Sequence, residues 1–276
     1  MNQKLFLGRK ENINMNFISG NIKGNICKDD LYFNKNTKIS SFNFLLVYES
    51  NIDIEIDGIL GLSKGSFNKK NSFLNQLKNK NIIKHILILY DLHNRSFYID
   101  EIPQMYLDQK SISCKDNEIN SHLWKCDLNY VVIDNIPIMI ENEIIFDSGT
   151  NGIIFPIKYE ETFQNICKNN LILQKGECKL EYIYEDKAYQ IICNKTLEYN
   201  DINNTEVILE FFLDKGQNNS FSMKLSDLIS EDFKSFYLFI FERKKEILLG
   251  SPFFEKYPVL FNFDDNVINI LLEEYI

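Results

Sequence analysis

Histidine is scarce in this sequence, which has only three among its 276 residues. His85 lies in a segment of alternating apolar and polar residues, His93 lies in a polar turn, and His122 comes shortly before Trp124. None has a cysteine or aspartate at the spacing of a metal site or of an activated thiol, so we interpret all three as ordinary surface or core histidines. Zinc and Cys-His chemistry are therefore disfavoured, and we expect no metal and no cofactor.

Long runs of one kind of side chain are also missing. The longest basic run is Arg243-Lys244-Lys245, and the formal net charge is -9 with a pI near 5.0. Such a chain has little with which to neutralise phosphates, so a nucleic-acid partner is disfavoured. No apolar run approaches the length of a transmembrane segment, and the apolar part of residues 1–8 is too short for a secretory signal.

The chain is rich in apolar residues, which make up 45% of it and are enough for one large core or two moderate ones. Alternation of apolar and polar residues predicts strands over most of the length. They include residues 39–49, 82–90, 96–99, 111–114, 123–133, 207–213, 220–225 and 236–242, and a final hairpin of 259–264 with 267–272. Only short helices are expected, over 73–78 with Ser72 as N-cap, from about Tyr159 to Leu173, and from Pro252 onward.

One stretch places an acidic residue at the bottom of a predicted hairpin of two apolar strands. Its sequence is Ile144-Ile145-Phe146-Asp147-Ser148-Gly149-Thr150-Asn151-Gly152-Ile153-Ile154-Phe155-Pro156. Both flanks predict buried strands, and a carboxylate between them costs free energy unless something uses it. The turn offers backbone N–H groups and two hydroxyls that could hold the carboxylate in one orientation. Asp, Ser and Gly are also common in plain surface turns, so the tripeptide alone leaves that alternative open.

A second element far downstream favours a functional site. Ile247-Leu248-Leu249-Gly250-Ser251-Pro252-Phe253-Phe254 is followed by Tyr257-Pro258-Val259-Leu260-Phe261-Asn262-Phe263-Asp264. Together with the Asp147 loop, these motifs resemble the carboxyl-terminal lobe of a pepsin-like (family A1) aspartic protease. That lobe has an Asp-[Thr/Ser]-Gly-Thr loop, a hydrophobic-hydrophobic-Gly strand, a Pro-Phe helix and a closing Phe-Asp strand, in the same order and at about the same spacing.

The resemblance implies an all-β fold of two lobes with a few short helices and a substrate cleft between the lobes. Residues 1–104 would be a partial amino-terminal lobe, residues 105–276 the carboxyl-terminal lobe, and the hinge would lie near residues 103–108. The chain would be an aspartic endopeptidase, acting on a peptide or protein substrate as a monomer.

The resemblance also assigns roles within the loop. Asp147 would be a catalytic aspartate that activates water. Substrate contacts are expected from Gly149, Thr150 and Asn151, and structural support from Ser148, Leu248, Leu249 and Gly250. We expect the carboxylate of Asp147 to accept hydrogen bonds from the Gly149 N–H and the Thr150 hydroxyl, with Leu249 and Gly250 close by.

The amino-terminal part contains a predicted hairpin that resembles the flap of this family. Residues 12–26 alternate polar and apolar side chains around a Ser19-Gly20 bend. Phe17 falls where the family usually has tyrosine, so apolar cover over the substrate would be kept and the tyrosine hydroxyl lost. The resemblance assigns Phe17, Ser19 and Gly20 to substrate binding, and an ordinary surface hairpin is the alternative.

Ile56-Asp57-Gly58-Ile59-Leu60-Gly61-Leu62 resembles the hydrophobic-hydrophobic-Gly element of the amino-terminal lobe. The glycines permit close backbone approach, and Ile59 and Leu60 are expected to fill a core beside an active-site loop. The resemblance therefore places Ile59, Leu60 and Gly61 next to the site.

The mechanism of the family uses two carboxylates, one from each lobe, that share a proton. Only one Asp-[Ser/Thr]-Gly occurs in this sequence, and the other should precede the flap by several tens of residues. We therefore expect the segment with the first Asp-Thr-Gly to be missing from this chain, which alone should be inactive.

Three functions are compatible with that expectation. The chain is a truncated form of an active endopeptidase, or a pseudoprotease that binds peptide or protein without cutting it, or a homodimer whose two Asp147 loops make the pair, as in small viral relatives. We rank the homodimer lowest, because a full carboxyl-terminal lobe already accompanies remnants of the other lobe. An in-frame Asp-Thr-Gly upstream of Met1, or a stable dimer that cleaves peptide, would discriminate among them.

Two cysteine pairs are candidates for disulfide bonds. Cys114 and Cys126 could face each other across two predicted neighbouring strands, and Cys178 and Cys193 bracket an alternating hairpin. The resembled family often closes a loop in this lobe with such a bridge.

The cysteines also bear on the compartment. Together with four Asn-X-Ser/Thr sequons they fit a glycoprotein of an oxidising secretory, lysosomal or vacuole-like compartment. Cys27 and Cys167 have no obvious partners, so reduced buried thiols are the alternative. The sequons begin at Asn94, Asn194, Asn203 and Asn218.

Overall fold

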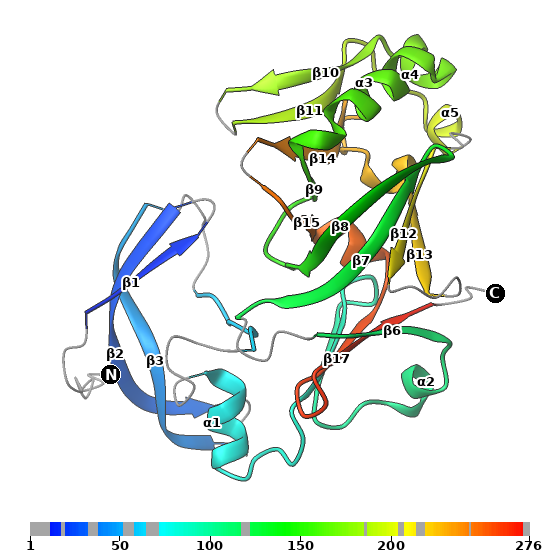
Figure 1. Ribbon diagram of the computed structural model, residues 1–276. Helices are drawn as coiled ribbons and strands as arrows, with labels where there is room; N and C mark the ends of the chain where they lie inside the picture. Colours follow the sequence, from blue (N-terminus) through cyan, green and yellow to red (C-terminus); the bar gives the residue numbers. More distant parts are fainter. Residues whose placement is uncertain are drawn as a thin grey trace. The chain divides into compact units, whose positions relative to one another are not determined.

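The computed structural model describes residues 12–17, 20–32, 38–51, 58–64, 72–116, 122–184, 187–203, 207–213, 219–242 and 244–272 (Figure 1). They belong to two compact units, residues 1–86 and 87–276. The described residues form three sheets and a few short helices, which confirms the predicted all-β class. None of the helices in the described ranges is long and apolar enough to cross a membrane.

The first unit contains a three-stranded antiparallel sheet in the order β1-β2-β3. Strand β1 (Asn12–Phe17) pairs with β2 (Gly20–Tyr32), and Phe17 lies opposite Gly20, so the predicted hairpin and its bend are confirmed. Strand β3 (Lys38–Ser50) pairs with the other side of β2.

Helix α1 (Phe73–Asn79) contacts one end of β3. The Ser72 hydroxyl accepts a hydrogen bond from the Asn75 N–H at 3.3 Å, which confirms the predicted N-cap. Gln76 is buried and substitutes for a neighbouring strand: its side-chain oxygen accepts from the Asn43 N–H (2.7 Å) and its side-chain nitrogen donates to the Asn43 carbonyl (2.9 Å). The ring of Phe73 packs edge-on against Phe42.

The rest of β3 is an apolar strand at the edge of the sheet. Leu46, Val47 and Tyr48 are 39%, 42% and 58% exposed. Among the described residues, β3 has no strand partner other than β2. An exposed apolar edge of this kind is a place where further strands can pair.

The second unit contains a nine-stranded sheet in the order β10-β11-β14-β9-β15-β8-β7-β12-β13. Its strands are β7 (Trp124–Ile133), β8 (Ile136–Phe146), β9 (Ile153–Pro156), β10 (Cys178–Ile183), β11 (Ala188–Cys193), β12 (Ile208–Leu213), β13 (Ser220–Lys224), β14 (Ser235–Phe241) and β15 (Ile247–Leu249). Most neighbours are antiparallel, but β15 is parallel to β8 and β14 is parallel to β9. The end of β8 and all of β9 and β15 are buried, as their continuous apolar sequence requires.

A five-stranded sheet in the order β5-β4-β16-β17-β6 completes the second unit. Its strands are β4 (Leu87–Asp91), β5 (Ser96–Ile99), β6 (Ser111–Lys115), β16 (Val259–Asn262) and β17 (Val267–Leu271). The predicted final hairpin is confirmed by the pairing of β16 with β17. Strand β4 also pairs with β16, so residues 87–99 lie with the carboxyl-terminal strands. The lobe boundary expected at residues 104 and 105 falls inside this unit, at α2 (Gln104–Leu107), and the division into two lobes stays a prediction.

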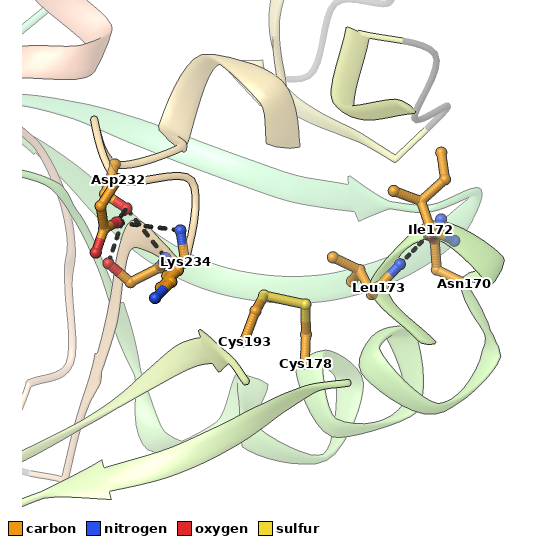
Figure 2. The surroundings of a disulfide bond; sticks show 9 residues. Asn170, Ile172, Leu173, Cys178, Cys193, Asp232 and Lys234 are labelled. Atoms are coloured by element: carbon orange, nitrogen blue, oxygen red, sulfur yellow. Dashed lines mark hydrogen bonds between the residues drawn. A yellow bond between two sulfur atoms is a disulfide. The ribbon is translucent and has the colours of Figure 1, made fainter. Parts of the chain in front are cut away.

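The remaining helices of the second unit are short. They are α3 (Glu160–Asn169), α4 (Leu171–Lys175), α5 (Tyr199–Asn203) and α6 (Ser251–Lys256), with the 3-10 turns η2 (Ile157–Tyr159) and η3 (Leu225–Leu228). The helix expected to continue to Leu173 is interrupted at Asn170. This residue leaves the helical conformation, and its side-chain oxygen accepts hydrogen bonds from the N–H groups of Ile172 and Leu173, so it caps α4 (Figure 2).

Both predicted disulfide bonds are present. Cys178 and Cys193 lie directly opposite each other in β10 and β11 (Figure 2). Cys114 and Cys126 are also bonded. The expectation that β6 and β7 are neighbouring strands is wrong, because β6 pairs with β17 and β7 pairs with β8. This second disulfide therefore joins the five-stranded sheet to the nine-stranded one. Cys27 and Cys167 are buried free thiols.

Candidate active site

Strand β15 fixes the two ends of the loop that contains Asp147. Leu249 of β15 lies beside Phe146 of β8 in a parallel pairing and beside Ile153 of β9 in an antiparallel pairing. The two apolar flanks are buried as predicted, but they do not form a hairpin with each other because β15 lies between them. Residues 147–152 therefore cross the end of β15.

Asp147 follows β8 directly, and hydrogen bonds hold both its backbone and its side chain. Its N–H donates to the Leu249 carbonyl (3.0 Å), and its own carbonyl accepts from the Thr150 N–H (3.0 Å). Carboxylate oxygen Oδ1 accepts from the Gly149 N–H (3.1 Å), and Oδ2 accepts from the Thr150 hydroxyl (2.8 Å). Both hydrogen bonds predicted for the carboxylate are thus present, and they orient it through its two oxygens.

Two glycines allow the backbone to close around this loop. A Cβ atom at Gly250 would lie 2.1 Å from the Thr150 carbonyl oxygen and 2.3 Å from that of Gly152. A Cβ atom at Gly152 would lie 2.7 Å from the Tyr237 carbonyl oxygen. Neither position has room for a side chain. The Ser251 N–H donates to the Thr150 carbonyl (2.8 Å), so Thr150 is bonded to Asp147 through its hydroxyl and to the start of α6 through its carbonyl.

Aromatic side chains fill the core next to the loop. The Phe146 ring contacts Phe253 of α6 with centroids 5.6 Å apart and Phe261 of β16 at 6.3 Å. Trp124 of β7 contacts Phe261 at 5.1 Å. Trp124 and Phe261 were not among the predicted supporting residues. Their aromatic side chains next to the motifs could have indicated that they pack beside the loop. They join both sheets of the second unit behind Asp147.

The loop is open to solvent on one side. Asp147 and Thr150 are half-buried, whereas Ser148, Gly149 and Asn151 are exposed. Leu248 and Leu249 are 3% and 0% exposed, as expected of residues that support the loop. The arrangement presents an oriented carboxylate on a rigid apolar base, which is what acid-base chemistry on a bound molecule requires. The described residues include no cluster of three or more histidine, cysteine or acidic side chains suited to a metal ion.

The predicted site residues of the first unit have different outcomes. Phe17 and Gly20 flank the hairpin bend, Ser19 lies outside the described residues, and the described part of Phe17 is its backbone. The expectation that Ile59 and Leu60 fill a core is wrong: they lie outside any strand and are 58% and 53% exposed. An added Cβ at Gly61 would meet no atom within 4 Å, so this segment is not closely approached by the described residues. The apolar pattern alone does not distinguish a buried pair from an exposed one.

Comparison with known proteins identifies a family. A family model described as eukaryotic aspartyl protease matches residues 6–271, which is nearly the whole chain. A search of curated proteins found no match.

Proposed function

The chain belongs to the eukaryotic aspartyl protease family, and on that premise we propose that Asp147 is one of the two catalytic carboxylates of an aspartic endopeptidase. The observation that supports this most is the carboxylate itself. It is held by the Gly149 N–H and the Thr150 hydroxyl at the buried end of β8, against Leu249 and Gly250. The substrate would be a peptide or protein, and the reaction hydrolysis of a peptide bond.

The reaction needs a base and an acid at the same carbonyl group. One carboxylate takes a proton from the attacking water while the other, protonated, donates to the carbonyl oxygen. Two carboxyl groups in contact can share a single proton because two negative charges at that distance repel. In this proposal Asp147 is one member, and the hydrogen bonds at both its oxygens keep it facing the substrate. The fixed geometry matters, because a carboxylate that rotates freely reaches the reactive arrangement only part of the time.

The substrate would lie along the exposed side of the loop. We assign contacts to Gly149, Thr150 and Asn151, and apolar cover to the hairpin tip at Phe17, Ser19 and Gly20. The division into lobes of residues 1–104 and 105–276 is part of this proposal.

The alternative is a pseudoprotease that binds peptide or protein without cleaving it. One observation favours it: the 276 residues contain a single Asp-[Ser/Thr]-Gly, so this sequence supplies one member of the pair. One carboxylate cannot act as base toward water and as acid toward the carbonyl in the same step.

The test joins the chain to an upstream segment that carries an Asp-Thr-Gly strand and assays cleavage of a peptide library at acidic pH. We expect cleavage that a pepstatin-like inhibitor blocks and that Asp147→Asn reduces by several orders of magnitude. Asp127→Asn, an exposed aspartate of β7, is the matched control and should change the rate little. Peptide binding without cleavage would favour the pseudoprotease, and cleavage that survives Asp147→Asn would refute the assignment.

A further inference from the structure

A small pocket lies beside β12 and β13, the two strands that end the nine-stranded sheet (Figure 1). It is lined by one residue of β12, three of β13, the residue that follows α6 and the residue that follows β17. These residues are Glu210, Ser220, Phe221, Ser222, Tyr257 and Leu272. Its volume is about 270 Å³, just below the range of about 300–1,000 Å³ that is usual for drug-sized ligands. The pocket therefore suits a small molecule or a single side chain.

The strand register brings the polar side chains of this pocket together. Glu210 lies directly opposite Ser222, and Ser220 is two residues from Ser222 along β13. Side chains in these positions project from the same face of a sheet. All three are half-buried, and β12 is paired on its other side with β7, so the backbone that carries Glu210 is held by both neighbouring strands. The group needs little rearrangement to meet a ligand.

The hydrogen bonds of the pocket leave acceptors rather than donors for a ligand. The Ser220 hydroxyl donates to Glu210 Oε1 at 3.1 Å, and the Tyr257 hydroxyl donates to the Ser222 carbonyl at 2.6 Å. A carboxylate and a carbonyl have no hydrogen to give, so in each bond the hydroxyl must supply the proton. The side-chain oxygens of Glu210, Ser220 and Tyr257 therefore offer lone pairs, which favours a ligand that donates hydrogen bonds.

The charges around the pocket leave the Glu210 carboxylate without a cation. It forms no ion pair in the described part of the chain. Lys256 is already paired with Asp227 at 2.6 Å. Two exposed lysines oppose the carboxylate from outside the lining: Lys224, on the same face of β13, and Lys110, whose carbonyl accepts from the N–H of the last lining residue. Their solvent-exposed charges are screened by salt more than a half-buried carboxylate is.

We propose that this pocket binds a primary alkylammonium group. An ammonium group has three hydrogen-bond donors and no acceptor, which matches a lining of lone pairs, and its bond to Glu210 would be charge-assisted. The side chain of Leu272 offers apolar surface to a short alkyl stem. A carboxylate or phosphate would be repelled by Glu210, and an apolar molecule would take this carboxylate out of water without a partner. Strands β12 and β7 separate β13 from β8, the strand that leads into Asp147, so the pocket is distinct from the proposed catalytic loop.

The test titrates n-butylammonium chloride into the isotope-labelled chain of 276 residues and follows the amide NMR signals of Ser220, Phe221 and Ser222. n-Butanol keeps the alkyl stem without the charge, and butyltrimethylammonium keeps the charge without N–H donors. We expect n-butylammonium to bind with a Kd of about 1–10 mM and the other two at least about tenfold more weakly. Binding of either comparison compound as tightly as n-butylammonium would overturn the proposal.

A peptide identifies the source of the ammonium group. Acetyl-glycyl-lysyl-glycinamide carries the same alkylammonium group on a polypeptide backbone. Binding of this peptide as tightly as n-butylammonium supports the site with a lysine of another chain as its ligand. Weaker binding of the peptide supports the site with a free amine as its ligand, because the small pocket then excludes the backbone on either side of the lysine.

Variants assign the binding to the named groups. Glu210→Gln should raise the Kd for n-butylammonium at least about tenfold, and Ser220→Ala about two- to fivefold. Lys224→Gln, which removes an opposing charge, should lower the Kd by up to about twofold at low salt. Glu181→Gln, at an exposed glutamate of β10, is the matched control and should leave the Kd unchanged. An unchanged Kd in Glu210→Gln or in Ser220→Ala would refute the site, and unchanged binding by Asp147→Asn keeps this result separate from the proposed catalytic function.

Discussion

Gly250→Ala tests how closely the backbone must approach the Asp147 loop. The added methyl group would lie 2.1 Å from the Thr150 carbonyl oxygen and 2.3 Å from that of Gly152. Ordinary van der Waals contact begins at about 3.5 Å, so at least one of these backbone segments must move by more than about 1 Å. The backbone angles of Gly250, φ -102° and ψ -156°, are open to any residue, so the cost is steric.

The magnitude follows from what the methyl group meets. Overpacking of a filled core typically costs about 1–3 kcal/mol. We expect about 3 kcal/mol for this substitution because the atoms it meets are backbone atoms held by hydrogen bonds. Residues 87–276 form a unit for which each kcal/mol corresponds to about 2–4 °C in Tm. The melting temperature should therefore fall by about 6–12 °C.

The measurement is thermal unfolding followed by circular dichroism, with Gly149→Ala as the matched control. A Cβ at Gly149 would meet one atom at 3.3 Å, the carboxylate Oδ1 of Asp147, in an exposed part of the loop. That variant should unfold within about 2 °C of the parent chain. Equal melting temperatures for the two variants would mean that α6 does not approach the loop as described.

Three further perturbations test other parts of the fold. The buried Tyr159 hydroxyl has no hydrogen-bond partner among the described residues, so Tyr159→Phe should keep or raise stability in urea unfolding by up to about 1 kcal/mol, and a loss above that would contradict the packing. Burial also raises the pKa of this tyrosine, so its contribution to stability is full below about pH 10 and falls as pH rises above it; the phenylalanine variant should lose less stability between neutral and strongly alkaline pH. Replacing Cys178 and Cys193 by serine opens a loop of 15 residues and should cost about 3 kcal/mol, whereas Cys27→Ser cannot act in this way and provides the comparison in non-reducing and reducing buffer. Leu46→Lys with Val47→Lys should reduce concentration-dependent association in sedimentation velocity if the open edge of β3 pairs between chains, and an unchanged profile would exclude that edge.

Local chemistry made much of this structure predictable. The Asp147 turn could be anticipated in detail because its donors lie within three residues of the carboxylate. The bend between Phe17 and Gly20, the Ser72 cap and the Cys178–Cys193 bridge are local in the same sense, since each depends on residues close in sequence or opposite in one hairpin.

The features that escaped prediction depend on contacts between distant segments. Nothing near residues 87–91 indicates that β4 pairs with β16, about 170 residues later, and the loop flanks do not reveal that β15 lies between them. Ile59 and Leu60 show the limit most clearly, because an apolar pair predicts burial and this pair is exposed. The prediction of one helix through Asn170 was wrong for a local reason. The Asn170 side chain caps α4 and so divides a segment for which the apolar spacing predicts a single helix.

The central claim is that Asp147 works as one member of a carboxylate pair. Its most direct test compares the rate of peptide cleavage at acidic pH by the 276-residue chain and by the same chain joined to an upstream Asp-Thr-Gly strand. The account predicts no cleavage by the first and inhibitor-sensitive cleavage by the second, lost on Asp147→Ala, because one carboxylate cannot serve as base and acid together. Inhibitor-sensitive cleavage by the 276-residue chain alone, lost on Asp147→Ala, would contradict it and indicate that two copies of this loop form the pair.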